Sequence, residues 1–298
     1  MKPVDLVIAV TVPVLWGAGF AVAKGSLDEF PPLFLMGMRF TFAALILVWF
    51  VRPLWNMTGR LALVTFFGGT LAYGLQFTGL LDLDASTAVL VVQVEVVFAA
   101  IMASIFFHDH LSRQQWCAMV MAFAGVALIA GEPRVHTAPL PFLMVVAGGL
   151  AWAAGQTMVK TLGPVGGLRL VAWFAAFAGP QMLVASLVVE SGQWQAVRQA
   201  SWSGWLSVVY LALFMTATGY ALWFRLIGRY RMNQIVPFLL LVPVTSIAGG
   251  VFFLGETLSP WIIAGGLLVM ASVTFIHLQQ PRLPAAAGKS TLEGRQES

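Results

Sequence analysis

Charged residues are scarce in this sequence. Aspartate, glutamate, lysine and arginine make up only 9% of its 298 residues, while hydrophobic residues make up 59%. Soluble globular domains usually carry about a quarter charged residues, so this chain has too few charges to cover a water-facing surface. Its apolar residues fall in runs of roughly 17 to 25, the length that a helix needs to cross the hydrocarbon core of a membrane. The composition therefore predicts an all-α polytopic membrane protein.

Cysteine pairs and nucleotide-binding motifs are absent. The single cysteine, Cys117, lies in an apolar run, which excludes an intrachain disulfide. The sequence contains no glycine-rich phosphate loop and no paired acidic metal cluster, which argues against ATP-driven transport by this chain alone. The net charge of +4 is a weak sign of a nucleic-acid partner, because basic residues in membrane proteins mostly report topology. We therefore expect no cofactor, no bound metal and no nucleic acid.

The segment His108-Asp109-His110 is the one cluster of potential metal ligands. Its i, i+2 spacing does not place both histidines on one helical face, unlike the i, i+4 pair of a zinc helix. An interfacial turn is therefore the favoured interpretation. An intramembrane enzyme, such as a lipid or prenyl transferase, would need a reactive cluster of this kind near one interface. We predict that the chain is not an enzyme, and an intramembrane transferase is the less favoured alternative.

Proline and glycine divide the apolar runs into separate spans. Breaks occur at Pro31-Pro32, Pro53, Gly163-Pro164 and Ser259-Pro260, where a helix is hard to continue. The runs between the breaks predict about ten transmembrane helices. They cover residues 4–24, 33–51, 61–81, 86–107, 114–131, 140–160, 168–189, 204–227, 232–254 and 260–278.

The basic residues are distributed unequally between the two sides of the membrane. If the N-terminus is cytoplasmic, most of the 16 lysines and arginines fall on the cytoplasmic side. Only Lys24, Arg134 and Arg198 fall on the opposite side, and Arg39 lies within a span. Because cytoplasmic loops carry an excess of basic residues, both termini are predicted to be cytoplasmic. An even number of spans agrees with this orientation.

Two short sequence motifs each occur twice. Residues 16–24, which begin with tryptophan and end with lysine, are echoed by residues 152–160, and residues 106–112 are echoed by residues 252–259. Such duplication in an apolar chain is typical of transporters built from structural repeats. Because each half has an odd number of spans, the second half must enter the membrane from the opposite side. The predicted organisation is ten transmembrane helices in two inverted five-helix repeats, over residues 1–134 and 135–280, followed by a disordered cytoplasmic tail over residues 281–298.

Two ionisable residues, Arg39 and Glu95, fall well inside predicted spans. A charge at this depth costs about 2.5–3.5 kcal/mol on insertion scales, so each is a functional candidate. At about 1.5 Å per residue, both reach a similar depth from the outer surface. In the functional interpretation, Arg39 receives a carboxylate and Glu95 accepts an amine or a coupling proton. The alternatives are a buried ion pair that only joins two helices, or an Arg39 that snorkels outward.

Uncharged polar and aromatic side chains also fall within the spans. Mixed aromatic and amide walls suit a large cavity for a small amphipathic solute. The alternative is that tryptophan and tyrosine form interface belts and that amides bond between helices. Gln93 and Glu95 are two residues apart on one helix and point about 160–200° apart, so we expect that they cannot both face a narrow cavity directly. With Arg39 and Glu95, the predicted substrate-binding set comprises Trp16, Tyr73, Gln76, Gln93, Trp152, Gln156, Tyr220 and Trp223.

Several segments resemble the EamA family of the drug/metabolite transporter superfamily, whose members are ten-helix exporters. Their order and spacing make the resemblance specific, and they run from the first predicted span to the last. A departure is His108-Asp109, which stands where the family pattern has Gly-Glu. The matching segments are residues 15–24, 31–40, 228–237, 240–244 and 255–258.

The resemblance implies a secondary exporter in the bacterial inner membrane, with a central cavity between the repeats and alternating access. The implied substrates are small amphipathic metabolites, first of all amino acids or metabolites of the cysteine pathway. Export of drugs or of other metabolites handled by the same superfamily is the alternative. The expected partners are the metabolite and membrane lipids, together with protons if Glu95 is a coupling residue. Facilitated diffusion is equally compatible with the sequence.

Overall fold

The structure, a computed structural model, describes residues 1–108, 111–137, 139–230 and 232–278. Every regular element in this part of the chain is a helix. It contains nine helical stretches that are long and apolar enough to cross a membrane, and a shorter apolar helix over Pro260–Ile276. The prediction of an all-α polytopic membrane protein is therefore confirmed. The predicted tail over residues 281–298, and Asp109 and His110 of the histidine segment, lie outside the described residues.

The first five spans occupy the first half of the chain. Two short 3-10 turns, η1 (Val48–Phe50) and η2 (Trp55–Met57), connect the second span to the third. The third span contains a π-helical segment, η3, and the fourth is interrupted at Gln93. The spans are α1 (Pro3–Ser26), α2 (Pro32–Leu47), α3–η3–α4 (Thr58–Thr65, Phe66–Leu71, Ala72–Gly79), α5–α6 (Ala85–Val92, Val94–Phe107) and α7 (Arg113–Ala130).

The second five spans repeat this pattern. The eighth span contains a second π-helical segment, η5, and the ninth contains a 3-10 segment, η6. The spans are α9 (Pro139–Val159) with η4 (Lys160–Leu162), α10 (Gly167–Val189), α12–η5–α13 (Trp202–Val209, Tyr210–Thr218, Gly219–Ile227), α14–η6–α15 (Met232–Ile235, Val236–Leu240, Leu241–Leu254) and α16 (Pro260–Leu278). Two short helices, α8 (Pro133–Thr137) and α11 (Gln193–Gln199), lie outside the spans.

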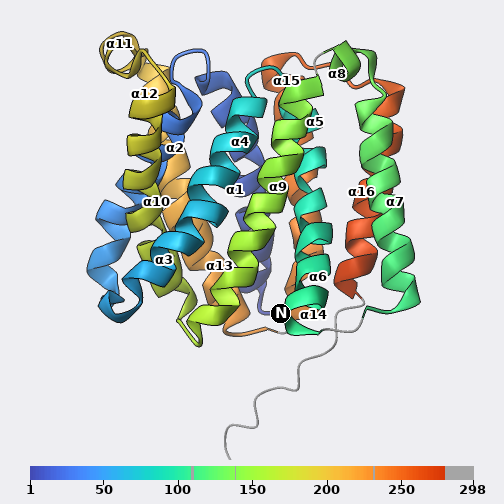
Figure 1. Ribbon diagram of the computed structural model, residues 1–298, viewed down its shortest axis with the longest axis horizontal. Helices are drawn as coiled ribbons and strands as arrows, with labels where there is room; N and C mark the ends of the chain where they lie inside the picture. Colours follow the sequence, from blue (N-terminus) through green and yellow to red (C-terminus); the bar gives the residue numbers. More distant parts are fainter. Residues whose placement is uncertain (109–110, 138, 231, 279–298) are drawn as a thin grey trace, which may run out of the picture.

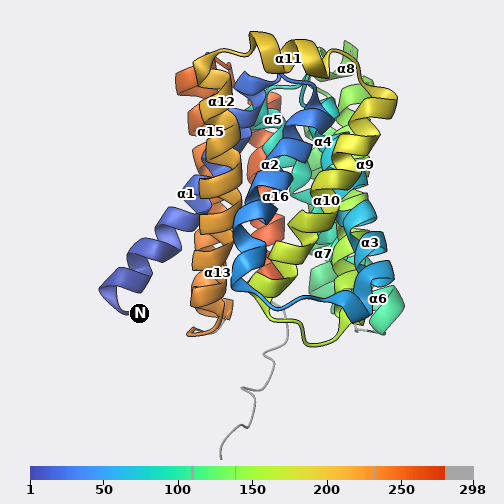
Figure 2. The ribbon, with the colours of Figure 1, turned by 90° about the vertical axis from the view of Figure 1, so that its left-hand side faces the viewer.

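The spans stand side by side as a bundle (Figure 1). From the N-terminus, α1 rises through the bundle, whereas its counterpart α9 descends (Figures 1 and 2). We call the end of the bundle that carries the N-terminus the N-terminal side, and the opposite end, where α8 and α11 lie, the loop side. The two five-helix halves therefore cross the bundle in opposite directions, as an inverted repeat requires.

Reciprocal glycine contacts relate the two halves. Between α2 and α10, a Cβ added at Gly37 would lie 2.8 Å from Leu183 Cδ2, and one added at Gly179 would lie 2.5 Å from Thr41 Oγ1. Small residues let helix backbones approach closely inside a membrane. Since Gly37 corresponds to Gly179, and Thr41 to Leu183, the residues between them also correspond. A second reciprocal pair joins α7 to α16, through the contacts Gly125–Val269 and Gly265–Ile129.

Candidate functional site

A cavity of about 430 Å³ lies between the two halves of the bundle. All ten residues of the predicted substrate-binding set line it. The first repeat contributes residues from α1, α2, α4, α5 and α6, and the second repeat contributes residues from α9, α13, η5, η6, α15 and α16. The polar residues of the sequence prediction therefore meet in one place, where both repeats can contact the same ligand.

Arg39 is fully enclosed by the two repeats. Its side chain is 1% exposed, and its Nε donates a hydrogen bond of 2.9 Å to Thr216 Oγ1. The guanidinium carbon lies 4.9 Å from the centre of the Phe40 ring and 5.4 Å from that of Tyr73, within the range of cation–π attraction. The alternative in which Arg39 snorkels to the surface is therefore wrong. The structure records no ion pair between Arg39 and Glu95, both of which it describes.

Glu95 and Gln76 pack against neighbouring glycines of α9. A Cβ added at Gly148 would lie 2.7 Å from Gln76 Cγ, and one added at Gly149 would lie 3.6 Å from Glu95 Cβ. The Gln76 amide nitrogen is buried and has no hydrogen-bond partner in the described part of the chain. A buried donor without a partner costs about 1–3 kcal/mol. Gln76 lines the cavity together with Glu95.

The expectation that Gln93 and Glu95 cannot both face the cavity is wrong. Both residues line it. The fourth span is not one regular helix, since α5 ends at Val92 and α6 begins at Val94. The backbone at the junction tightens into a shorter turn, in which Val96 N bonds to Gln93 O at 3.2 Å. From this junction Gln93 Nε2 contacts Met270 Sδ of α16 at 3.8 Å, whereas Glu95 packs against Gly149 of α9, so the two residues line the cavity from beside different helices.

Aromatic side chains form much of the wall. Trp16 is held by a hydrogen bond of 3.0 Å from Nε1 to the Met215 carbonyl oxygen, and its ring lies 5.1 Å from Tyr220 and 5.7 Å from Trp223 between centroids. These distances suit edge-on and tilted aromatic packing. Trp152, on α9, lines the cavity from the second repeat. The wall is therefore apolar over most of its area, with a few polar groups set into it.

Sequence reasoning missed several apolar lining residues. Phe20, Phe77 and Phe224 also line the cavity. Each of them lies four positions after a predicted site residue on the same helix. Phe20 follows Trp16, Phe77 follows Tyr73, and Phe224 follows Tyr220. Residues four apart share one helical face, and this spacing was the signal that could have found them. Val89, Val92, Val96, Met215, Pro237, Leu239, Leu240, Val242, Val273 and Thr274 complete the lining.

Glutamates on the loop side join the two repeats. Glu190, at the end of α10, accepts the backbone N–H groups of Leu33 and Phe34 at 2.8 and 3.1 Å. Glu256, after α15, accepts the backbone N–H and hydroxyl of Ser86 at 3.0 and 2.6 Å. Carboxylates are favourable at helix N-termini, where free N–H groups and the helix dipole meet them. We call these contacts of Glu190 and Glu256 the loop-side clasp.

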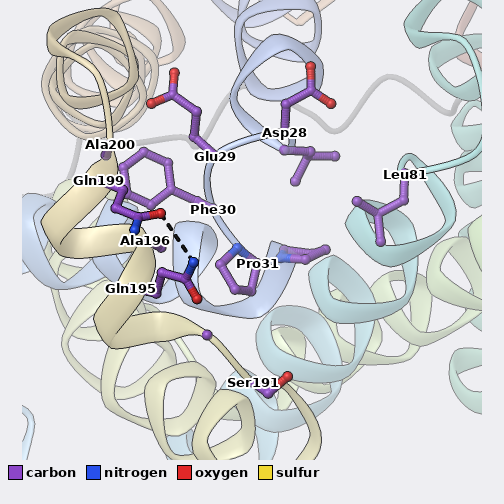
Figure 3. A pocket seen from close by; sticks show the side chains of 13 residues that line it. Asp28, Glu29, Phe30, Pro31, Leu81, Ser191, Gln195, Ala196, Gln199 and Ala200 are labelled. Atoms are coloured by element: carbon purple, nitrogen blue, oxygen red, sulfur yellow. Dashed lines mark hydrogen bonds between the residues drawn. The ribbon is translucent and has the colours of Figure 1, made fainter.

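Other bonds reinforce this side of the bundle. Glu29, between α1 and α2, accepts the Ser201 hydroxyl at 2.7 Å at the start of α12. Lys24 donates to the Leu80 and Leu81 carbonyls, at 2.8 and 2.7 Å, where α4 ends. A second hollow, of about 520 Å³, lies between α11 and the α1–α2 connection, and Glu29 is one of the residues that line it (Figure 3). None of the ten predicted site residues lines this hollow.

The lining residues of the cavity differ in exposure between the two sides of the bundle. At its loop-side end, Gln76 and Phe77 are 5% and 1% exposed. Toward the N-terminal side, by contrast, Gln156 and Pro237 are exposed. On the same side, the buried Asp5 of α1 accepts the Tyr230 hydroxyl at 2.8 Å, which ties α1 to the end of the eighth span. The described lining is therefore more exposed toward the N-terminal side than toward the loop side.

Metal ligands do not gather at this site. In the described ranges, no group of three or more histidine, cysteine, aspartate or glutamate side chains could hold a metal ion. His108 ends α6 in the left-handed conformation, with φ of 57°. This conformation makes His108 the C-cap of a span.

Comparison with known proteins identifies relatives along nearly the whole chain. A model of the EamA-like transporter family matches residues 5–131 and again residues 139–278. The chain is 32% identical over 287 residues to a probable amino-acid metabolite efflux pump of Salmonella typhimurium, and 30% identical over 287 residues to a protein of the same description from Escherichia coli. Each alignment covers 92% of this chain and 94% of the relative.

More distant similarity extends to other transporters and to a solved structure. An uncharacterised transporter of Bacillus subtilis is 26% identical over 288 residues, with 92% of each chain covered. One crystal structure, at 18% identity, superposes with a TM-score of 0.62 and covers 96% of this chain and 100% of that chain. At this identity the structural match supports the shared fold.

Proposed function

Since the chain belongs to the EamA-like transporter family, we propose that it exports small amphipathic metabolites by alternating access. Family membership makes it a multi-pass membrane transporter and not an enzyme. Amino acids and metabolites of the cysteine pathway are the first candidate substrates, in keeping with the description of its relatives as probable amino-acid metabolite efflux pumps. Drugs or other metabolites are the alternative within the same superfamily.

The observation that carries the proposal is the cavity between the repeats. It brings a guanidinium from α2 and a carboxylate from α6 into one aromatic enclosure of about 430 Å³. Arg39 can receive an acid group, and Glu95 can accept an amine. Ligand pockets for small molecules are mostly apolar with a few placed polar groups, and this lining has that character. A small zwitterion with an apolar side chain would match the guanidinium of Arg39, the carboxylate of Glu95 and the apolar wall of the cavity.

The unequal exposure of the cavity lining on the two sides supports alternating access. The clasp joins the two repeats on the loop side, while the lining residues Gln156 and Pro237 on the N-terminal side are exposed. The excess of basic residues supports a cytoplasmic N-terminus in the bacterial inner membrane, so the cavity would load from the cytoplasm. Rocking of one repeat against the other around a fixed midplane site would then close the N-terminal side and open the loop side. The direction of this cycle is export.

Two energy sources fit the cavity. In the first, Glu95 carries a proton inward in exchange for the substrate, since an ionisable side chain at membrane depth is suited to a proton relay. In the second, the metabolite moves down its own gradient by facilitated diffusion. Glu95 distinguishes them, because only the first mechanism needs a group that gains and loses a proton during each cycle.

The proposal is tested with the purified protein in lipid vesicles. The vesicles are loaded with labelled cysteine, O-acetylserine, threonine or aromatic amino acids, and efflux is measured without ATP. We expect protein-dependent efflux of at least one of these solutes, inhibited by the unlabelled solute. Protein-free vesicles are the control for leakage. Efflux equal to that of protein-free vesicles for every solute would contradict the proposed substrates.

A further inference from the structure

The hydrogen bond that holds Arg39 is part of a chain of two bonds. Arg39 Nε donates to Thr216 Oγ1 at 2.9 Å, and the Thr216 hydroxyl donates in turn to the Leu211 carbonyl oxygen at 2.8 Å. Arg39 and Thr216 are 1% and 0% exposed. Because the hydroxyl proton is already directed to Leu211, the oxygen of Thr216 presents a lone pair to the guanidinium. The second repeat therefore fixes the side chain of a residue in the first.

The π-helical segment η5 provides Thr216, which accepts the hydrogen bond from Arg39. A threonine in a regular α-helix bonds to the carbonyl three or four residues before it. Thr216 instead bonds to Leu211, five residues before it, inside the π-helical Tyr210–Thr218. Such segments are rare and occur frequently at functional sites. The widened turn places the Thr216 hydroxyl at the level of Arg39.

The remaining contacts of Arg39 restrict the plane of its guanidinium. The rings of Phe40 and Tyr73 lie 4.9 and 5.4 Å from its central carbon. One terminal nitrogen, Nη1, lies 3.6 Å from Met36 Sδ, which is only a weak acceptor. The centroids of these two rings are 5.2 Å from each other, so both rings contact the guanidinium from the same side, and together with the Nε bond they limit the directions of its terminal nitrogens. Arg39 lines the cavity, so these directions matter for any ligand within it.

We infer that Thr216 is the positioning residue that orients Arg39 toward the acid group of the ligand. This inference rests on the proposed function of the cavity. The substrate class that it requires is a small molecule with a carboxylate, held by a bidentate guanidinium fork. Thr216 does not touch the ligand and acts through Arg39.

The other repeat provides an internal comparison. Gln181 corresponds to Arg39 in the reciprocal packing of α2 and α10, and it too is bonded to a π-helical segment of the opposite repeat. Thr70, in η3, donates to Gln181 Oε1 at 3.0 Å, and Gln181 Nε2 donates to the Ala62 carbonyl at 3.1 Å. Gln181 is not among the described lining residues of the cavity. In both repeats a threonine of a π-helical segment is bonded to a side chain of the opposite repeat, Arg39 in one case and Gln181 in the other. Only Arg39 is charged and lines the cavity.

The test measures binding of two matched probes, L-phenylalanine and L-phenylalaninamide, to the purified full-length protein in nanodiscs. The probes share a ring and an amine and differ in the carboxylate. Trp16, Trp152 and Trp223 line the cavity, so intrinsic tryptophan fluorescence reports binding. Thr216→Val removes the hydroxyl at nearly constant volume, and Thr216→Ser retains it. Thr70→Val, which removes a hydroxyl from the other π-helical segment, is the matched control.

The wild-type protein, Thr216→Ser and Thr70→Val should all prefer L-phenylalanine. Thr216→Val should bind L-phenylalanine at least about tenfold more weakly, which corresponds to one hydrogen bond to a charged group. Its affinity for the amide should stay within about twofold, because the amide does not use the fork. A wild-type protein without preference, or a Thr216→Val that keeps the preference, would overturn the inference. If Thr216→Val does not fold, Thr216→Ala serves in its place.

Export from loaded vesicles is scored separately from this binding. If the wild-type protein prefers the carboxylate probe, Thr216→Val loses that preference, and no metabolite is exported, the proposed function fails and the role of Thr216 stands. If metabolites are exported and Thr216→Val binds both probes as the wild-type protein does, the role of Thr216 fails and the proposed function stands.

Discussion

Glu256 accepts two hydrogen bonds from Ser86, one from its backbone N–H at 3.0 Å and one from its hydroxyl at 2.6 Å. Ser86 lies in the first turn of α5, in the first repeat, and Glu256 follows α15 in the second. Gly255, just before Glu256, has φ of 69°, a conformation that favours glycine and turns the chain sharply after the helix. The loop side therefore cannot open between these helices while this contact persists.

Weakening the clasp should open the loop side. In Glu256→Gln the charge that the α5 N-terminus favours is lost, so the balance should shift toward a loop-side-open state. The measurement uses Cys117→Ser protein with a new cysteine at Val89, a buried lining residue. A membrane-impermeant maleimide added on the loop side should label this cysteine about fivefold faster in Glu256→Gln, as expected for about 1 kcal/mol. Asp82→Asn, at an exposed carboxylate, is the control; equal labelling in both variants would contradict the role of the clasp.

Replacing Glu95 should separate the two energy sources. Glu95→Gln keeps the size of the side chain but cannot exchange a proton. If Glu95 carries the proton, an imposed pH gradient will accelerate efflux from wild-type vesicles and will have no effect on the variant. Efflux is measured with and without the gradient, and Asp82→Asn should respond as the wild-type protein does. A gradient response that survives Glu95→Gln would exclude Glu95 as the coupling residue.

Lysine should not replace Arg39. Arg39→Lys keeps the positive charge, but it loses the Nε bond to Thr216 and the planar fork that contacts the Phe40 and Tyr73 rings. We expect the KM for a carboxylate substrate to rise at least about tenfold, because a charged hydrogen bond and a bidentate contact are both lost. Arg198→Lys, at an exposed arginine that lies over Trp194, should transport normally. Full activity in Arg39→Lys would show that charge alone suffices.

Substitutions of His108 and of Gly255 should change the thermal stability of the protein in opposite directions. Both end a span in the left-handed conformation, with φ of 57° and 69°. A side chain in this conformation costs about 1–2 kcal/mol, so His108→Gly should raise the melting temperature in detergent and Gly255→Ala should lower it. Circular dichroism of the two variants measures the effect. A His108→Gly protein that melts below the wild-type protein would mean that the imidazole makes a stabilising contact.

The spans and their inversion could be predicted because the signals are local. The length of an apolar run and its proline breaks depend on neighbouring residues, and the repeated phrases at residues 16–24 and 152–160 are visible without a structure. The residues that line the cavity could be predicted in part for a related reason. A polar or aromatic side chain inside a span, such as Arg39 or Gln156, is conspicuous against its apolar surroundings.

Other features depend on contacts between distant segments. That Glu190 would meet Leu33, and that Glu256 would meet Ser86, could not be predicted, because each residue simply follows a span in the sequence. The π-helical segments have no recognised sequence signal, so the bond between Thr216 and Leu211 was also missed. The junction at Gln93 falls in a run of valines that favours no particular break. The packing of the two repeats determines the glutamate contacts, the bond of Thr216 and the junction at Gln93.

The most direct test of alternating access is the two-sided accessibility of one cavity residue. A cysteine at Val96, which lines the cavity, is placed in Cys117→Ser protein in oriented vesicles, and a membrane-impermeant maleimide is added to either side. We predict labelling from the N-terminal side without substrate, and a shift toward labelling from the loop side when a transported amino acid is present. Labelling from one side alone, unchanged by the amino acid under every condition, would contradict the account.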